Sequence, residues 1–407
     1  MLEIYGREKM KYYTKEKKVY EIDESNPFEY TLTEYDVFGD DIRTSFMIGN
    51  DVIATIFNSN EPESSIKKIQ AMIESSAQKN TDNLDWPIEF LYDENGSVVG
   101  YTRHYFKGKE LDYPDIEDPL KDLNWYTEVL LVTNLASAVK NVHQMGHVVG
   151  DLEIVVKYDD KGNLALGPCD AFAITDLKNH TTYYFDKVID EEGAWHFGYI
   201  APEMIGKVGA ERLRYTKEMD NFVLATLIYQ ILSYNTHPYE LFCLFDPTKS
   251  EEGWKYRCTD GLDENILNGT CILFPETYKP CVIDESYSRR FTLAPDEIFP
   301  NSICELFRKT FVDGHKNPEK RATSEEWYTA LCDLRDNLKQ CDRNPMHYYY
   351  NGFKECPLCL NEKRKSGKDD STDNGNNDNN DDIVKDLDAA VNDLIDSGIG
   401  LLKKFFK

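Results

Sequence analysis

A chain of 407 residues, 41% of them hydrophobic, is long enough to bury a large core. Its formal net charge of −27 argues against binding nucleic acid, because a polyanionic partner would be repelled. No apolar run of transmembrane length occurs, and the first residues lack the apolar stretch of a signal peptide, so we expect a cytoplasmic protein. Ten irregularly spaced cysteines then indicate reduced thiols, with room for one metal site, and not a disulfide framework.

The N-terminal part of the chain is rich in strand patterns. We treat residues 1–28 as an N-terminal extension, and residues 29–106 as a small unit of alternating apolar and polar segments. Gly49-Asn50 and Asn95-Gly96 predict two hairpin turns, because both residue types tolerate a positive φ. One helix is expected in this unit, from Ser64 to Gln78, since isoleucines recur there at helical spacing.

The next part, residues 107–340, is dominated by helical patterns. A long apolar-periodic helix is expected from Asn124 to Gln144, followed by a hairpin from Val155 to Leu166. Three further helices are expected, at residues 218–233, 301–312 and 323–339. A small strand-rich unit followed by a larger helical unit predicts an α+β fold with two lobes.

Three short acidic runs stand in order in the middle of the chain. They are Val149-Gly150-Asp151, Asp170-Ala171-Phe172 and Ala201-Pro202-Glu203. Asp220 opens a predicted helix after them, and Arg321 lies in the later run Asn317-Pro-Glu-Lys-Arg-Ala-Thr. Phosphoryl transfer needs carboxylates of this kind, one to orient the accepting hydroxyl and another to hold metal ions on the phosphates.

Together these runs resemble the catalytic half of bacterial, eukaryotic-like protein kinases, over about residues 30 to 338. The resemblance implies a bilobal kinase fold, with a small lobe over residues 29–106 and a large lobe over residues 107–340. It also implies that Asp151 acts as the base-like residue and that Asp170 binds the Mg²⁺ of ATP. The remaining roles implied are structural: Asp220 braces the catalytic loop, and Arg321 forms a buried bidentate pair with Glu203.

Two positions depart from the kinase pattern in ways that affect the chemistry. Thr55 occupies the strand position where kinases carry the Lys that pairs with the α- and β-phosphates, and Val156 replaces the Asn that holds the second metal ion. The region of the phosphate lid has one glycine followed by Asp40 and Asp41, whose carboxylates would repel phosphates. The kinase pattern also has a carboxylate on the helix of the small lobe. Either Glu63 or Glu74 could supply it in this sequence.

We therefore favour a catalytically impaired pseudokinase that acts as a scaffold or allosteric regulator in a bacterial signalling or stress system. The alternative is an active, ATP-dependent protein Ser/Thr kinase that uses Asp151 and Asp170 with a displaced Lys. A third class is a zinc-dependent adaptor for protein interactions. Relatives in the kinase-like group are often associated with phosphatase and von Willebrand factor A proteins, so the resemblance implies a protein partner of that kind.

Four metal-ligating residues follow the kinase-like part, within residues 341–362. Cys341, His347, Cys356 and Cys359 supply three sulfurs and one imidazole, and Pro357 makes the CxxC turn rigid. This is the ligand set of a closed, tetrahedral zinc site like those of zinc ribbons, so we expect structural Zn²⁺ here. Free cysteines in a reducing compartment are the alternative.

The last part of the chain has two patterns. Residues 363–382 are rich in Asp and Asn and poor in apolar residues, which predicts a linker. Residues 383–407 predict an amphipathic helix that ends in Phe405, Phe406 and lysines. We favour docking of this helix to a protein partner over contact with a membrane, because its acidic polar face opposes binding to anionic lipid.

Overall fold

The computed structural model of the chain describes residues 9–25, 27–32, 42–57, 61–76, 83–111, 120–150, 152, 155–169, 172–183, 198–205, 214–233, 235–240, 242–244, 257–258, 262–277, 282–283 and 293–365. All of these belong to one compact unit, Met1–Lys365. The predicted helix at 383–407 and most of the predicted linker at 363–382 lie outside the described residues.

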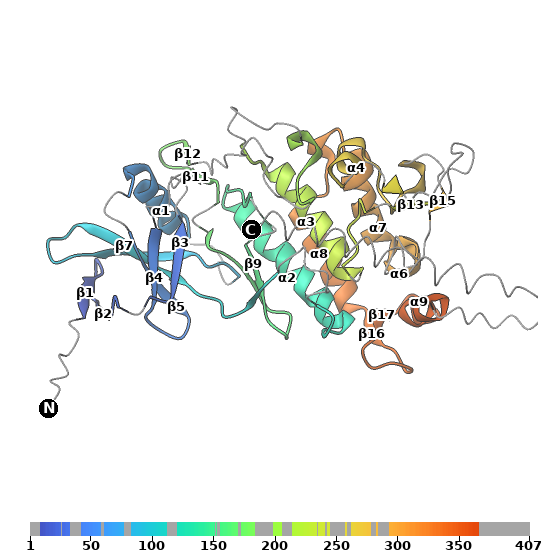
Figure 1. The fold of residues 1–407 in the computed structure, drawn as a ribbon, viewed down its shortest axis with the longest axis horizontal. Coiled ribbons are helices and arrows are strands. Elements are labelled where there is room, and N and C mark those ends of the chain that lie inside the picture. Colours follow the sequence, from blue (N-terminus) through green and yellow to red (C-terminus); the bar gives the residue numbers. More distant parts are fainter. Residues whose placement is uncertain are drawn as a thin grey trace, which may run out of the picture. The chain divides into compact units, whose positions relative to one another are not determined.

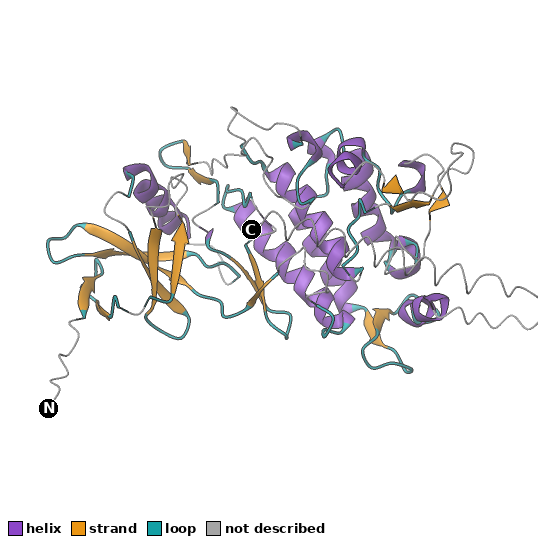
Figure 2. Cartoon of the chain, viewed as in Figure 1, coloured by secondary structure: helices purple, strands orange, loops and turns teal. Residues whose placement is uncertain are grey.

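The described part has a mixed α+β fold, with its largest sheet before helix α2 and most of its helices after it (Figures 1 and 2). A seven-stranded antiparallel sheet has the strand order β2-β1-β6-β7-β5-β4-β3. Its strands are β1 (Met10–Tyr13), β2 (Val19–Ile22), β3 (Glu29–Leu32), β4 (Ile42–Met47), β5 (Val52–Ile56), β6 (Pro87–Tyr92) and β7 (Val98–His104). Helix α1 (Glu63–Ser76) is the one described helix between these strands.

The two faces of the sheet are distinguished by strand register. Ser45 pairs with Thr55 and Ile53 pairs with Arg103, so these four side chains project from the same face. The side chains at the intervening strand positions project from the other face. Five of them form a small separate core: Tyr12, Ile22, Phe46, Ala54 and Leu91. The hairpin β1–β2 contributes Tyr12 and Ile22 to this core, so part of the predicted N-terminal extension belongs to the sheet.

Helices α2 (Trp125–Gln144), α3 (Lys217–Leu232) and α8 (Ser324–Asp336) form the centre of the second half of the unit, with α2 in contact with both of the others (Figure 1). Each begins at a polar N-cap whose side chain accepts a backbone N–H, namely Asn124, Thr216 and Thr323. From Asp220 to Leu232 every residue of α3 is buried, which identifies it as a central helix.

Smaller elements surround these helices. The helices are α4 (Leu262–Asn268), α6 (Pro295–Ile298), α7 (Asn301–Arg308) and α9 (Pro357–Lys365). Short 3-10 helices are η3 (Pro202–Met204), η4 (Pro275–Thr277) and η6 (Pro318–Lys320), and η5 (Lys309–Asp313) is a π-helical turn. The strands are β8 (Lys109–Glu110), β9 (Val156–Tyr158), β10 (Leu164–Leu166), β11 (Ile174–Asp176), β12 (Thr181–Tyr183), β13 (Phe242–Leu244), β14 (Arg257–Cys258), β15 (Val282–Ile283), β16 (Leu338–Gln340) and β17 (Tyr348–Tyr350).

One hydrophobic core runs through most of the unit. It begins with Met72 of α1 and Tyr101 of β7, continues through α2, α3, α7 and α8, and reaches Cys356 and Cys359 at α9. The predicted helix at 323–339 ends early, because residues 338–340 pair with β17 as strand β16. Among the described residues, no helix is long and apolar enough to cross a membrane.

His147 connects α1 to this core. Its ring stacks on Trp86 at a centroid distance of 5.7 Å, its Nδ1 accepts the Thr175 N–H at 3.1 Å, and its Nε2 lies 3.1 Å from Ser75 Oγ of α1. Since Nδ1 is an acceptor, the neutral ring carries its proton on Nε2 and donates to Ser75. Burial, with a smaller contribution from Lys217, lowers the pKa of His147 to about 4.

The lowered pKa of His147 predicts acid lability. The unfolded chain takes up a proton near pH 6.5 and the folded chain only near pH 4, so the free energy of unfolding should fall as pH falls through this window. Between pH 7 and pH 5 the loss from this residue should be about 2 kcal/mol. Urea unfolding of wild type and His147→Gln at pH 7 and pH 5 measures it, and the variant should lose less stability on acidification.

His104→Gln is the matched control, because His104 is exposed at the end of β7. It should keep the pH dependence of the wild type. An unchanged pH dependence in His147→Gln would contradict the assignment to His147.

Candidate functional site

The loop at residues 147–150 is held by a buried carboxylate. Asp220, in the first turn of α3, has no exposed surface, and it accepts the Val149 N–H at 2.7 Å and the Gly150 N–H at 2.9 Å. Gly150 has φ +87°, a conformation that L side chains rarely adopt, so glycine suits this position. The resemblance to kinases implies that Asp220 braces this loop, and the structure shows these two hydrogen bonds. Asp151, which follows the loop, lies outside the described residues.

The same carboxylate joins three helices through His143 at the end of α2. His143 Nε2 lies 2.9 Å from Asp220 Oδ2, and its Nδ1 lies 3.1 Å from Ser324 Oγ at the start of α8. Lys217 of α3 donates to the His143 carbonyl. Because charges and dipoles in this region are buried and mutually bonded, the ends of α2, α3 and α8 are fixed relative to the loop.

A second ion pair ties η3 to the turn after η6. The Arg321 side chain is fully buried and donates to both Glu203 oxygens, at 2.8 and 2.6 Å. Its other N–H groups reach the carbonyl oxygens of Gly314 and Glu218, and the guanidinium lies over the Phe222 ring. The resemblance to kinases implies this bidentate pair, and the structure shows both of its hydrogen bonds.

Thr55 lies in a closed polar network on the face of the sheet that it shares with Ser45 and Arg103. Its hydroxyl is buried, 3.0 Å from Ser45 Oγ, and accepts from Arg103 Nε at 3.4 Å. The guanidinium of Arg103 also donates to Asp85, 3.4 Å away, and Lys157 Nζ lies 3.9 Å from the same oxygen. The position at which the resemblance expects a lysine is therefore a bonded, neutral hydroxyl.

Asp85 connects this network to the hairpin β9–β10. Its backbone N–H bonds to the Leu166 carbonyl at 2.8 Å, and its carboxylate accepts the Phe106 N–H at 3.1 Å. A Cβ at Gly167 would lie 2.3 Å from Asp85 Cβ, so only glycine permits this close approach. The sheet and the hairpin are thus joined by buried ionic contacts between β7, Asp85 and β9.

Two buried cations around α1, Arg43 and Lys68, are not indicated by any sequence motif. Arg43 of β4 donates to Glu61, with Nε 3.2 Å from Oε2, and to Ser65 Oγ at 2.5 Å, so it bonds α1 and the residues before it. Lys68 also lies on the buried face of α1. Alternation along β4 could have indicated Arg43, because it shares a face with Ser45. Both of the anticipated helix carboxylates instead form exposed contacts, Glu63 with Lys67 and Glu74 with Lys178.

Val156 is part of the core and offers no metal ligand. Its side chain is buried in β9, and its carbonyl accepts the Leu111 N–H. The nearby Asn163 bonds to Asp159 within its own turn, at 2.8 Å. Asp170, Asp40 and Asp41 lie outside the described residues.

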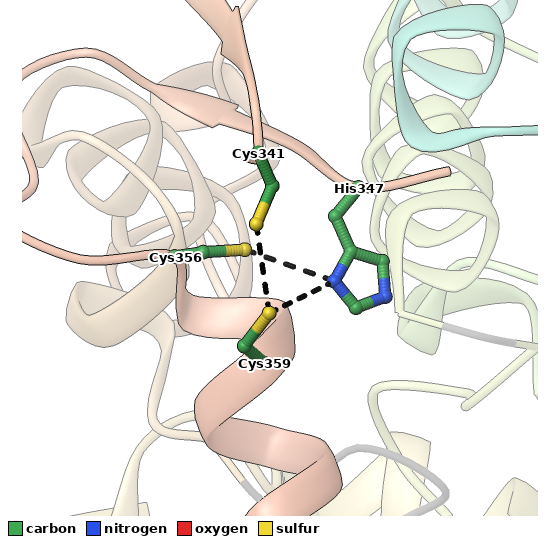
Figure 3. Close-up of side chains that lie close together, drawn as sticks. All are labelled: Cys341, His347, Cys356 and Cys359. Atoms are coloured by element: carbon green, nitrogen blue, oxygen red, sulfur yellow. Dashed lines mark hydrogen bonds between the residues drawn. The ribbon is translucent and has the colours of Figure 1, made fainter. Parts of the chain in front are cut away.

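Cys341, His347, Cys356 and Cys359 converge in a buried cluster (Figure 3). The ligand atoms of all four lie within 4.8 Å of one another. Cys341 Sγ is 3.6 Å from Cys359 Sγ, and His347 Nδ1 is 3.4 Å from Cys359 Sγ and 3.8 Å from Cys356 Sγ. A tetrahedral zinc ion would separate two sulfurs by about 3.8 Å and a sulfur from a nitrogen by about 3.5 Å. The cluster therefore fits a metal ion such as zinc.

Without a metal ion, burial favours the neutral thiol form of two of the cysteines. Burial, with the neighbouring sulfurs, raises the pKa of Cys359 to about 12, and burial also raises the pKa of Cys356. Burial opposes the thiolate of Cys341 too, but N–H donors from Arg343 and Asn344 outweigh it and lower the pKa of that thiol. Three adjacent thiolates in a buried site need a compensating positive charge, which a divalent metal ion supplies.

Comparisons with known proteins point to kinases. No protein-family model matches the chain. The chain is similar to a protein named "Protein kinase YegI" of Escherichia coli (strain K12), with 26% identity over 325 residues, which cover 76% of this chain and 45% of that protein. The protein of the same name from Escherichia coli O157:H7 gives the same values. The match thus spans less than half the length of these relatives, and it supports a kinase-like family for this chain.

The Arg321 pair makes a prediction about stability. Arg321→Lys should lower the free energy of unfolding by about 2–4 kcal/mol, because an ammonium cannot form the planar bidentate pair and leaves buried acceptors unsatisfied. Urea denaturation measures the loss. A change below about 0.5 kcal/mol would contradict the role given to Arg321.

Arg364→Lys is the control of the same chemistry. Arg364 also forms a bidentate pair, with Glu297, but its side chain is 38% exposed. Because exposed ion pairs contribute little, this variant should lose at most about 1 kcal/mol.

Proposed function

We propose that this protein has a bilobal, protein-kinase-like fold and acts as a catalytically impaired scaffold or allosteric regulator. The sheet with α1 would form the small lobe, and the helices from α2 onward the large lobe. The single observation that carries the impairment is Thr55, whose buried hydroxyl is bonded to Ser45 and Arg103 where a kinase has its phosphate-binding Lys.

The retained frame supports the kinase-like half of the proposal. Asp220 bonds the loop that precedes Asp151, and Arg321 pairs with Glu203. Neither contact performs chemistry, because both groups are buried in the scaffold. The similarity to proteins named as protein kinases supports the same conclusion.

The lost contacts support the impairment. Catalysis of phosphoryl transfer is almost entirely positioning and charge stabilisation, so it depends on the Lys and on two metal ions. Thr55 supplies no charge, and Val156 is an apolar core residue that cannot bind a metal ion. Arg103 lies beside Thr55, but its guanidinium is engaged by Asp85. A scaffold role needs a protein partner, which the charge of −27 allows more readily than nucleic acid.

A second candidate function is an active, ATP-dependent protein Ser/Thr kinase that uses Asp151 and Asp170. The observation that favours it is Arg43, a cation on the strand next to β5 and on the same face of the sheet as Thr55. In this alternative Arg43 serves as the displaced cation that binds the phosphates of ATP. Its ion pair with Glu61 argues against it, because a phosphate would have to compete with that carboxylate.

We further propose that the cysteine–histidine cluster binds structural zinc. All four protein ligands are present and buried, so no coordination position is left open for water. A catalytic zinc site would need such an open position. Zinc would fasten the segment from β16 to α9, which forms the end of the hydrophobic core. An adaptor function carried by this module alone would make the kinase-like part dispensable.

Nucleotide binding distinguishes the two kinase-like alternatives. The melting temperature of the wild type should rise by less than about 1 °C with ATP and Mg²⁺, because the phosphate contacts are missing. Differential scanning fluorimetry measures the shift. A clear, magnesium-dependent rise would refute the impaired-kinase proposal.

Two arginine variants identify the source of any such rise. Arg43→Gln should abolish it if Arg43 binds the phosphates, whereas Arg308→Gln, at an exposed arginine of α7, should leave it unchanged.

Zinc content tests the metal proposal. The purified protein should contain about one zinc per chain, and removal by a chelator should lower its melting temperature by roughly 5–10 °C, because the metal binds only the folded site. Elemental analysis with a thermal melt measures both quantities. Cys359→Ser should lose the zinc, and Cys332→Ser, outside the cluster, should keep it. Metal-free wild-type protein with an unchanged melting temperature would refute the site.

A further inference from the structure

Glu362 lies beside the metal cluster without belonging to the ligand set. Its Oε1 is 3.3 Å from Nε2 of His347, on the side of the ring opposite to the sulfurs. The His347 side chain is buried, whereas that of Glu362 is 59% exposed. The contact therefore joins the buried imidazole to a carboxylate at the surface.

This contact bears on which nitrogen of His347 carries the proton. A carboxylate accepts hydrogen bonds, so a hydrogen bond across this contact places the proton on Nε2. The lone pair is then on Nδ1, the nitrogen that lies 3.4 Å from Cys359 Sγ and 3.8 Å from Cys356 Sγ. Glu362 thus favours the tautomer that can bind a metal ion inside the cluster.

Asn344 favours the opposite tautomer. Its Nδ2 lies 3.1 Å from the same Nε2 of His347, and its Oδ1 is occupied by the Met346 N–H at 3.0 Å. An amide N–H can donate only to an unprotonated Nε2, which would place the proton on Nδ1 and block metal binding. Two neighbours therefore compete for the ring, and only Glu362 supports the ligand form.

Helix α9 sets the position of Glu362. Cys356, Cys359 and Glu362 are spaced by three residues, which places them on one side of the helix and its N-terminus. The helix is anchored by the buried Leu358, and its exposed Arg364 also pairs with Glu297 of α6. The carboxylate is thus supported by the element that supplies two of the sulfurs.

We propose that Glu362 is a positioning residue for the metal site: it accepts the Nε2–H of His347, holds the ring with Nδ1 toward the sulfurs, and raises the affinity for the metal ion. This inference rests on the proposed zinc site. Removing such an outer hydrogen-bond partner typically costs 10- to 100-fold in metal affinity. Because Glu362 is largely exposed, we expect a loss near the lower end, about 10-fold.

The test is zinc affinity in the full chain, measured by competition with a chromophoric chelator. Glu362→Ala should bind zinc about 10-fold more weakly than the wild type. Glu362→Gln keeps an acceptor oxygen and should recover most of the loss. Asn344→Ala removes the competing donor and should bind zinc at least as tightly as the wild type. Glu319→Gln removes one exposed carboxylate in η6 and is the control for net charge.

Two further measurements separate positioning from a structural role. Co²⁺-loaded Glu362→Ala should keep the wild-type absorption spectrum, because the three sulfurs and one nitrogen remain the ligands. When both proteins are loaded with zinc, the variant should have a lower melting temperature than the wild type. When both are metal-free, their melting temperatures should be equal. Unchanged zinc affinity, or an equal loss of stability in the metal-free protein, would overturn the inference. Absence of zinc from the wild type would instead refute the proposed metal site.

Discussion

The carboxylate of Asp220 is the contact on which the arrangement of the helices depends. A fully buried carboxylate is tolerated only when donors surround it, and here two backbone N–H groups and the His143 ring provide them. The requirement fixes the loop at residues 147–150 on α3. Through His143 the same hydrogen-bond network reaches Ser324, so it holds the ends of three helices and one loop together. Arg321 and Glu203 extend the same frame with a second buried pair.

The sheet obeys a different constraint. The Thr55 hydroxyl is bonded to Ser45 and Arg103, and Asp85 links Arg103 to Lys157 through ionic contacts. Removing one partner from such a buried group leaves an uncompensated charge, so the network resists change once it is formed. In the proposed function, the helical frame of a kinase persists, and the sheet face that carries Thr55 holds a structural ion network in place of phosphate contacts. These two properties are what a regulator with a kinase's shape requires.

The sequence predicts the parts that depend on local pattern. Apolar periodicity locates α2 and α3 to within one residue at each end, and the cysteine spacing identifies all four members of the metal cluster. The parts that it misses depend on tertiary contacts. Whether Arg43 is buried depends on Glu61 and Ser65, which lie near it only once β4 packs against α1. The hairpin β1–β2 is short and weakly patterned, so only its pairing with β6 reveals it. Glu362 gains its role from the position of His347, which sequence spacing does not indicate.

The central claim is that the frame is kept while the chemistry is lost. A phosphotransfer assay with radiolabelled ATP and Mg²⁺ tests it most directly, comparing the wild type with Asp170→Ala on itself and on a generic protein substrate. We expect the wild type to incorporate no more phosphate than Asp170→Ala. Magnesium-dependent incorporation by the wild type that disappears in Asp170→Ala would contradict it.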